Sequence, residues 1–388
     1  MAVTPQSMRT SNDNVILDAL MKHGSLSRAD ISRYTGLSKP TVSAAVERLI
    51  DRRLAVETGQ ANNAQGRKAT LVSFNERDYY TCGIDLGATR IRIALSDLSG
   101  RLVGYDACPM PADAAGNEVL ALIKSRADLM LSLNNVKWQQ LKHVCVGVPA
   151  VVLPGTRQIS RIVSPLAGLQ ESFGLESLSA LFPCEVMIEN DVNLAALGEQ
   201  KQGAAQGVGL FAFFSIGAGT GGGIVVDGRL LQGNGGLAGE LAEMLLPDGS
   251  RLESALSAMG LMTLAERMLG EREDAEARAL ADNLSPESLF SAARRGEAAA
   301  GEILEAYGKR IAWAIHNLCA VLAPELVVLG GGIGGRGDLL LPILRRLQAS
   351  GLATGPKLVA SELGDRAVVL GASRLALERT IESLRLES

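Results

Sequence analysis

The segment Thr81–Ser96, TCGIDLGATRIRIALS, has the pattern of two β-strands joined by a glycine-containing turn. The segment Leu210–Val226, LFAFFSIGAGTGGGIVV, repeats this pattern, and each copy is followed within a few residues by the tripeptide Gly-Arg-Leu. Apolar runs on both sides of a glycine turn are typical of β-hairpins. The repeat therefore predicts an internal duplication, in which two similar α/β lobes face each other across a cleft, the usual place for a ligand.

The turns of both hairpins are suited to phosphate. In Asp85–Thr89 and in Gly217–Gly223, glycines leave backbone N–H groups and hydroxyls accessible without obstruction by a Cβ atom. A third glycine segment, Leu326–Gly334, follows an apolar strand and is expected under a nucleotide base, and Asp85 is suited to hold Mg²⁺ through water. Taken singly, each turn is more often a tight hairpin or a close-packing site. The residues assigned to phosphate or nucleotide binding are Asp85, Gly87, Thr89, Gly217, Gly219, Thr220, Gly221, Gly331 and Gly332.

Between the two hairpins, an apolar strand ends in Glu189-Asn-Asp-Val-Asn193, just before a predicted helix. Asp191 and Asn193 are residue types that cap helix N-termini, which is one interpretation. At a strand end that faces a cleft, Asn190 and Asp191 are instead suited to bind hydroxyls, with Asp191 as general base on a sugar hydroxyl. Glu240 and Glu243 are two further candidate acceptors for sugar hydroxyls. The alternative is that both carboxylates lie exposed on a helix.

At the N-terminus, apolar residues between Asn14 and Leu54 fall at helical spacing in three successive segments. Ser27-Arg-Ala-Asp30 is a capping box for the second helix. Gly36 makes a turn, and Ser38 caps the third helix with Pro40 in its first turn. Two short helices around a glycine turn predict a helix-turn-helix, whose second helix enters the major groove of DNA. A three-helix bundle used for dimerisation is the alternative.

Two short strands, 54–56 and Thr70–Phe74, flank a polar segment and predict a β-wing with a basic tip. Residues 1–77 contain 11 Lys/Arg and 7 Asp/Glu, a net charge of +4, whereas the remainder contains 27 and 35, a net charge of −8. Local positive charge favours nucleic acid, although chance clustering also gives a value of this size. The predicted DNA contacts are Arg28, Ser38, Lys39, Pro40, Thr41, Ser43, Arg67 and Lys68.

Length and composition exclude several classes of protein. A chain of 388 residues exceeds one ordinary core and predicts two or three domains. With 47% hydrophobic and 21% charged residues, the chain is neither disordered nor collagen-like. The uncharged run Gly209–Val226 contains six glycines and is expected to form buried strands, not a membrane span, and the N-terminus has no signal-peptide pattern. The five cysteines are scattered, which predicts reduced thiols in a cytoplasmic protein.

These motifs together resemble the ROK family of repressors, uncharacterised reading frames and sugar kinases, and within it the regulators of the N-acetylglucosamine and xylose repressor type. The resemblance covers nearly the whole chain. It implies a winged helix-turn-helix followed by a two-lobed actin-like or hexokinase-like (ribonuclease H-like) body, a homodimer or homotetramer, and DNA binding that a sugar modifies. The segments that carry it are Leu26–Ser32, Gly36–Ser43, Asp85–Thr89, Gly147–Pro149, Glu189–Asp191, Gly217–Gly223, Gly239–Glu240 and Pro324–Gly332.

The chain departs from the family pattern in the segment after Gly239. Family members carry Gly-Glu-x-Gly-His and then C-x-C-G-x-x-G-C, which bind a structural zinc, but here the sequence is Gly239-Glu-Leu-Ala-Glu243 and then 247–253 without cysteine. We therefore predict no zinc and no other bound metal, with Glu243 at the position of the family's sugar-binding histidine. By the same resemblance Glu253 matches a family carboxylate. The predicted sugar-binding residues are Asn190, Asp191, Glu240, Glu243 and Glu253.

The expected domains follow from the motifs. Residues 1–78 form the DNA-binding domain, 79–198 the first lobe, completed by a C-terminal helix at 374–388, and 199–373 the second lobe, which carries the ligand cleft and the oligomer contacts. No membrane partner is expected.

These motifs are consistent with two functions. The first is a sugar-responsive transcriptional regulator in the bacterial cytoplasm, most simply a repressor, which binds a palindromic, A·T-rich operator and needs no cofactor. Closure of the lobes around a sugar would then change the spacing of two winged helices. The second is an ATP-dependent sugar kinase with a DNA-binding arm, in which ATP and Mg²⁺ are cofactors and Asp191 is the catalytic base.

Overall fold

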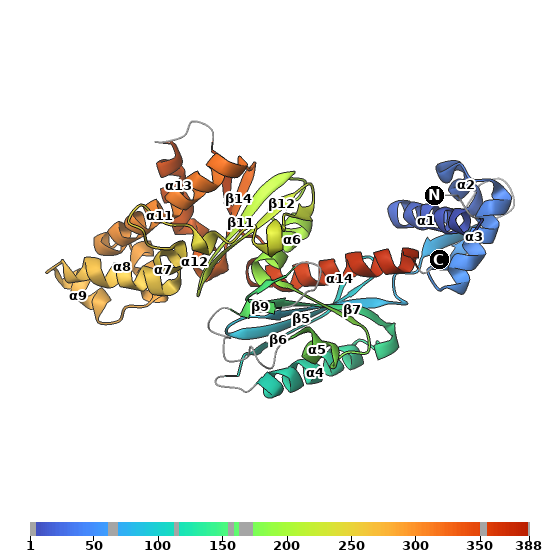
Figure 1. Cartoon of the computed structure of the whole chain (residues 1–388), viewed down its shortest axis with the longest axis horizontal. Helices are drawn as coiled ribbons and strands as arrows, with labels where there is room; N and C mark the ends of the chain where they lie inside the picture. Colours follow the sequence, from blue (N-terminus) through green and yellow to red (C-terminus); the bar gives the residue numbers. More distant parts are fainter. Residues whose placement is uncertain are drawn as a thin grey trace.

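The computed structural model describes residues 5–60, 69–111, 116–153, 159–162, 174–349 and 355–386. Arg67 and Lys68, predicted at the tip of the wing, lie outside the described residues. The molecule is elongated, with the N-terminal helices at one end and two α/β lobes in sequence beyond them (Figure 1).

The N-terminal unit has the predicted helix-turn-helix and wing. The Ser27 side chain accepts a hydrogen bond from the backbone N–H of Asp30, and the Asp30 carboxylate accepts one from the N–H of Ser27, so the predicted capping box is present. Gly36 ends the second helix with φ +73°, and Ser38 caps the third. The elements are α1 (Pro5–His23), β1 (Leu26–Ser27), α2 (Arg28–Thr35), α3 (Lys39–Asp51), β2 (Ala55–Gln60) and β3 (Thr70–Phe74).

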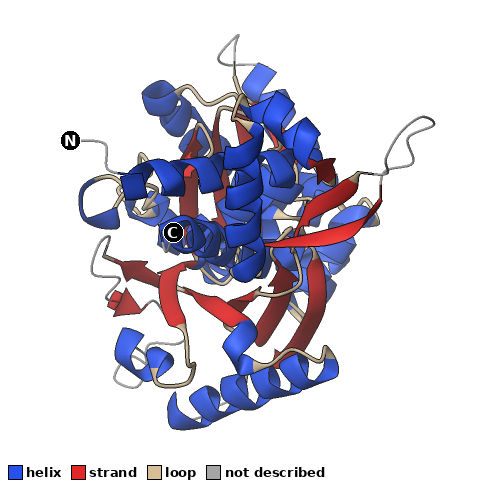
Figure 2. Cartoon of the chain, turned by 90° about the vertical axis from the view of Figure 1, so that its right-hand side faces the viewer, coloured by secondary structure: helices blue, strands red, loops and turns tan. Residues whose placement is uncertain are grey.

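One apolar core holds these helices together. Ile16, Leu20, Ile31, Val46 and Leu49 are each at most 1% exposed. Helix α1 begins at Pro5, well before the first apolar residue that revealed it in the sequence. Figure 2 looks onto this end of the molecule, where the three helices lie in front of the sheets of the body.

The first lobe is built on a five-stranded sheet of order β10-β7-β4-β5-β6. Strands β4, β5 and β6 form an antiparallel meander, and β7 and β10 are added in parallel to β4. The elements are β4 (Tyr80–Leu86), β5 (Arg90–Asp97), β6 (Leu102–Pro109), α4 (Gly116–Leu133), β7 (Leu141–Val148), β8 (Ala150–Val152), β9 (Ile159–Ile162), α5 (Leu175–Ser179), β10 (Glu185–Asn190) and α6 (Asp191–Gln202).

The second lobe repeats this arrangement. Its sheet has the order β13-β12-β11-β14-β15, in which β11, β12 and β13 form the meander and β14 and β15 are parallel to β11. The strands are β11 (Leu210–Ile216), β12 (Thr220–Val226), β13 (Arg229–Leu230), β14 (Leu326–Gly330) and β15 (Lys357–Ala360). Because both sheets place a three-stranded meander beside two parallel strands, the predicted duplication is confirmed in the topology.

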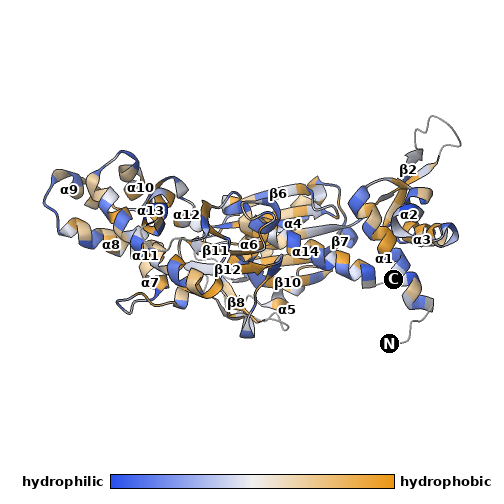
Figure 3. Cartoon of the chain, turned by 90° about the horizontal axis from the view of Figure 1, so that it is seen from above, coloured by the Kyte–Doolittle hydropathy of each residue, from blue (hydrophilic) through white to orange (hydrophobic). Residues whose placement is uncertain are grey.

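Seven of the fourteen α-helices of the described residues lie in the second lobe, and its outer helices display both polar and apolar residues (Figure 3). They pack around Tyr307, whose hydroxyl donates a hydrogen bond to the Leu256 carbonyl and which has no exposed surface. The α-helices are α7 (Leu252–Leu256), α8 (Ala258–Gly270), α9 (Ala275–Ala281), α10 (Pro286–Arg294), α11 (Ala298–Leu322), α12 (Gly331–Gly334) and α13 (Gly337–Ala349).

The last helix, α14 (Ala367–Leu386), returns to the first lobe and lies against α6, β4 and β7. It begins at Ala367, earlier than the 374 expected from the sequence. Glycines bring its backbone very close to its neighbours: a Cβ atom on Gly371 would lie 1.8 Å from the Leu194 carbonyl oxygen, and one on Gly83 would lie 2.4 Å from the Ser373 nitrogen. The position of α14 is therefore set by backbone contact.

We expect Gly371→Ala to destabilise the protein, because the added methyl group has no room and overpacking of this kind costs roughly 1–3 kcal/mol or more. Gly301→Ala is the matched control, since Gly301 lies inside α11 with nothing within 4 Å of an added Cβ. That change should be neutral or stabilising by about 0.5–1 kcal/mol. Urea unfolding followed by circular dichroism measures both; equal midpoints for the two variants would contradict the close α6–α14 contact.

Candidate functional site

The first residues of α3 form the exposed end of the helix-turn-helix. Ser38, Lys39 and Pro40 are exposed, whereas Thr41 and Ser43 are half-buried. The Thr41 hydroxyl is 2.8 Å from that of Ser38. An exposed lysine and hydroxyl groups at a helix N-terminus suit contacts with a phosphate and with the neighbouring base edges.

Arg28, the remaining described residue among the predicted DNA contacts, lies at the start of α2. Its guanidinium pairs with the Glu57 carboxylate on the wing strand β2 at 3.0 Å. This ion pair links the helix-turn-helix to the wing, and DNA phosphates would compete with Glu57 for the same guanidinium.

A cavity of about 400 Å³ lies in the cleft between the two lobes. The first lobe contributes Glu189, Asn190 and Asn193, and the second contributes Glu240. Helix α14 forms part of the wall through Leu375 and Glu378. The cavity therefore contacts both lobes and the C-terminal helix at once. Its other polar lining residues are Arg229 and Gln232.

Asn190 is the N-cap of α6. Its side-chain oxygen accepts from the N–H groups of Val192 (2.9 Å) and Asn193 (3.0 Å), and its amide donates to the Ala150 carbonyl (3.0 Å). The cap is thus formed by Asn190, and not by Asp191 or Asn193, the alternative that the sequence left open. The cap fixes the start of α6 and leaves Asp191 as its first residue.

Asp191 lies among other carboxylates. Burial, together with the negative charges of Asp85 and Glu240, raises the pKa of Asp191 to about 7, against the hydrogen bond from the Val192 N–H. Burial also raises the pKa of Asp85 to about 6, opposed by the guanidinium of Arg92. A carboxyl group that titrates near neutrality can both accept and hold a proton, as a general base does.

Asp85 is paired with Arg92, a residue that the sequence interpretation did not select. Arg92 Nη1 lies 3.0 Å from Asp85 Oδ2, and Arg92 Nη2 lies 3.1 Å from Asp365 Oδ2. Asp85 and Arg92 are directly opposite each other in the β4–β5 register. The signal was available, since a hairpin with a four-residue turn after Leu86 places these two side chains on facing strands.

The second glycine turn contains a carboxylate. Glu253 Oε2 accepts a hydrogen bond from the Thr220 N–H at 2.7 Å, and a Cβ atom on Gly219 would lie 3.1 Å from Glu253 Oε1. Burial raises the pKa of Glu253, while the hydrogen bond from Thr220 lowers it. The structure therefore places Glu253 at the turn predicted to bind phosphate, and Glu253 does not line the 400 Å³ cavity.

The remaining predicted residues lie in separate places. Glu243 is exposed and pairs with Arg251 at 3.1 Å, away from the cavity. Gly331 and Gly332 lie against Gly217, since a Cβ on Gly217 would be 3.2 Å from the Gly332 nitrogen. Of the predicted sugar-binding residues, Asn190 and Glu240 therefore line the cavity together. Asp191 is near enough to Glu240 for that charge to raise its pKa.

The described residues include no group of three or more His, Cys, Asp or Glu side chains able to hold a metal ion. The absence of zinc stays a prediction. Within the same part of the chain, no helix is both long and apolar enough to cross a bilayer.

The fold and the cleft define a class of protein, a winged helix-turn-helix joined to a two-lobed α/β body of the sugar-kinase type. The profile of the ROK family matches residues 81–379, and that of the MarR family matches residues 15–67. The chain belongs to the ROK family.

Relatives extend over different parts of the chain. The xylose repressor of Caldicellulosiruptor bescii is 25% identical over 95% of this chain and 96% of its own. The glucokinase of Halalkalibacterium halodurans is 29% identical, over 78% of this chain and 96% of its own. A solved ROK family transcriptional regulator, a homolog of the E. coli MLC protein, has the same fold with a TM-score of 0.76, at 23% identity and 98% coverage of both chains.

We expect Asp191→Asn to stabilise the protein more at pH 8 than at pH 5. The folded pKa of about 7 lies above the ordinary aspartate value of about 3.9, so folding takes up a proton in this window and the ionised carboxylate costs stability as pH rises. Asparagine does not ionise. The Tm gain at pH 8 should exceed the gain at pH 5 by roughly 5–10 °C, as expected for about 2–3 kcal/mol.

Thermal unfolding at both pH values measures this effect. Asp282→Asn is the control, because Asp282 is exposed on the second lobe. A gain for Asp191→Asn that is the same at pH 5 and pH 8 would show that this carboxylate does not titrate in the window.

Proposed function

We propose that this protein is a sugar-responsive transcriptional regulator that represses its targets. The observation that carries the proposal is that one helix, α14, connects the wall of the cleft with the DNA-binding unit. The similarity to a xylose repressor over 95% of the chain, winged helix included, supports the same function.

At the cleft, α14 contributes Leu375 and Glu378 to the cavity wall. Glu378 pairs with Arg374 on the same helix at 3.0 Å and lies 3.8 Å from Lys201 on α6. A ligand that moves α6 would therefore act on α14 through the Lys201–Glu378 contact.

At its other end, α14 meets the end of α3, the recognition helix of the helix-turn-helix. Arg52, the cap residue that follows α3, donates a hydrogen bond from Nη2 to the Leu384 carbonyl, and Arg385 pairs with Asp18 of α1. Leu377 and Leu384 are buried within the same apolar cluster as the core of the winged helix. The helix that forms a wall of the cleft is thus part of the core that holds the recognition helix.

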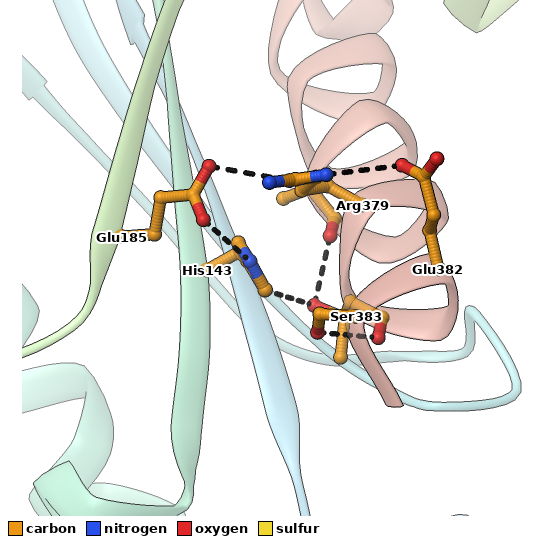
Figure 4. Close-up of polar contacts among 7 residues, drawn as sticks. His143, Glu185, Arg379, Glu382 and Ser383 are labelled. Atoms are coloured by element: carbon orange, nitrogen blue, oxygen red, sulfur yellow. Dashed lines mark hydrogen bonds and ion pairs between the residues drawn. The ribbon is translucent and has the colours of Figure 1, made fainter. Parts of the chain in front are cut away.

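The middle of α14 is anchored on the first sheet. Figure 4 shows Glu185 of β10 facing both His143 of β7 and Arg379 of α14. The Arg379 Nε to Glu185 Oε1 distance is 3.2 Å. His143 Nδ1 lies 2.8 Å from the Thr380 hydroxyl. Burial lowers the pKa of His143, although the Glu185 carboxylate opposes the effect. The lowered pKa favours the neutral form of the imidazole in these contacts. These contacts make α14 a stiff connection.

The ligand is a sugar or sugar derivative, bound through hydroxyls by Asn190, Asp191 and Glu240. Carboxylate and amide oxygens at a cavity wall suit neutral polyols. The protein acts as a homodimer or homotetramer, so that paired recognition helices read a palindromic, A·T-rich operator with half-sites about 34–36 Å apart or multiples of that distance. Residues 1–78 bind DNA in this scheme, and the two lobes hold the sugar.

A sugar kinase is the second candidate. A pKa of about 7 for Asp191 suits a general base, and the glucokinase relative is 29% identical over the body of the chain. Mg²⁺-dependent ATP binding by the unmodified protein separates this candidate from the first.

We expect Lys39→Ala to weaken binding to every DNA sequence and to reduce the slope of log affinity against log salt by about one unit, because one phosphate contact is lost. Lys309→Ala is the control, since Lys309 is exposed on α11 in the second lobe. The operator is first selected from a random DNA pool, and mobility shifts are then measured at several salt concentrations. Failure to enrich any sequence overturns the proposed function.

We expect Arg52→Ala to bind operator and sugar but to lose the linkage between them. Wild-type coupling should lie in the usual range of about 5–150-fold, and the variant should approach one. Arg53→Ala is the control. Arg53 is the next residue in the chain, but its side chain is 74% exposed, and its ion pair with Asp78 is long, at 4.0 Å. Operator affinity is titrated with and without the sugar that gives the largest thermal shift. Unchanged coupling in Arg52→Ala would contradict the role of α14.

A further inference from the structure

The nucleotide half of a sugar-kinase cleft would lie at the glycine turns. A bound Mg²⁺·ATP needs a carboxylate open to the metal and its waters, and it needs free N–H groups for the phosphates. The residues of this chain can be tested against both requirements.

The carboxylate of Asp85 already has a cation. Arg92 Nη1 lies 3.0 Å from Asp85 Oδ2, and both side chains are buried, with 12% and 4% exposed. The guanidinium also lies over the first turn, since a Cβ on Gly87 would be 3.4 Å from Arg92 Nη1. A metal ion at Asp85 would therefore have to displace a fixed positive charge.

Asp365 holds that charge in place. Its carboxylate accepts from Arg92 Nη2 at 3.1 Å, and it belongs to the short turn Gly364–Arg366 that leads directly into α14. Arg92 thereby connects β4 and β5 of the first lobe to the start of the helix that reaches the winged helix.

The second turn holds a carboxylate of the protein itself, while the buried Thr220 hydroxyl has no partner among the described residues. The Thr220 N–H donates to the Glu253 carboxylate at 2.7 Å, which places a negative charge where a phosphate would need a donor. The following glycines are in contact with α6: a Cβ on Gly221 would be 2.9 Å from Val192, and one on Gly223 would be 2.9 Å from Ala196. These glycines are used for helix packing. The residues present do not fit Mg²⁺·ATP.

We propose that Arg92 is an internal cation that takes the place of the metal at Asp85, so that the cleft responds to its sugar without a nucleotide. The inference rests on the proposed function and deepens it, because it makes the cleft a sensor for a single ligand. Arg92 is a specificity-determining residue: its guanidinium excludes Mg²⁺·ATP and at the same time ties the first lobe to the start of α14.

The test is binding of Mg²⁺·ATP to the full chain, measured by calorimetry and by the fluorescence of a methylanthraniloyl-ATP analogue, with and without Mg²⁺. We expect the unmodified protein to show no Mg²⁺-dependent binding at millimolar nucleotide. Arg92→Met keeps the unbranched apolar part of the side chain and removes the charged guanidinium, and should bind Mg²⁺·ATP at least tenfold more tightly. Arg90→Met is the control on the same strand, because Arg90 is exposed, and should behave as the unmodified protein.

A second variant covers the case in which Arg92→Met does not fold. Asp365 is 71% exposed, so Asp365→Asn keeps the fold and releases one of the two contacts of the guanidinium. It should bind Mg²⁺·ATP more tightly than the unmodified protein, by a smaller factor. Tight Mg²⁺·ATP binding by the unmodified chain overturns the inference, and so does the absence of any gain in both variants. The selection of an operator from random DNA is carried out on the same preparation. Failure of that selection contradicts the proposed function, whereas the nucleotide measurements test the role of Arg92 alone.

Discussion

Direct backbone contact between α14, α6 and β4 is the constraint on which the rest of the structure depends. Gly371 and Gly198 face each other's helices with no side chain between them, and a Cβ on Gly198 would lie 2.4 Å from the Ala367 carbonyl. The buried carboxylate of Glu199 on α6 adds to this contact by accepting from the Leu363 N–H at 3.0 Å, just before α14. Packed elements joined in this way move as units, so under the proposed function α14 would carry a shift at the cleft to the winged helix.

The same helix is also linked to the charged residues of the cleft. Burial of the Asp85, Asp191 and Glu253 carboxylates opposes folding, and Asp85 and Glu240 repel the charge of Asp191. Arg92 compensates the charge of Asp85. Groups that cost stability are retained where they serve a site. Because the compensating guanidinium also reaches Asp365 at 3.1 Å, the electrostatic balance of the cleft and the position of α14 depend on the same side chain.

Local sequence signals were sufficient for much of the fold. The capping box at Ser27–Asp30 and the turn at Gly36 depend on neighbours in the chain, so they could be predicted and are present. The duplicated hairpins predicted two matching sheets because hairpin pairing is also local. The partners of Glu243 and Glu253 could not be predicted, since they depend on how 240–258 folds over the second turn, a segment where the zinc motif of the family is missing. Arg52 meeting Leu384 is a contact across the whole chain, which no local pattern encodes.

The two hairpin turns have similar sequences but differ in the charged group that each one contacts. In the first, a carboxylate at the end of β4 is neutralised by a guanidinium from the facing strand. In the second, a backbone N–H of the turn is satisfied by a carboxylate from α7. Each turn therefore holds a charged side chain of the protein itself. This side chain is the Arg92 guanidinium in the first turn and the Glu253 carboxylate in the second. A turn that is open to phosphate must leave its donors to the ligand, and one that is satisfied internally is free to act as a rigid part of the lobe. The duplicated glycine turns of this protein, which first suggested phosphate, are better explained as the fixed joints between each sheet and the helices that border the cleft.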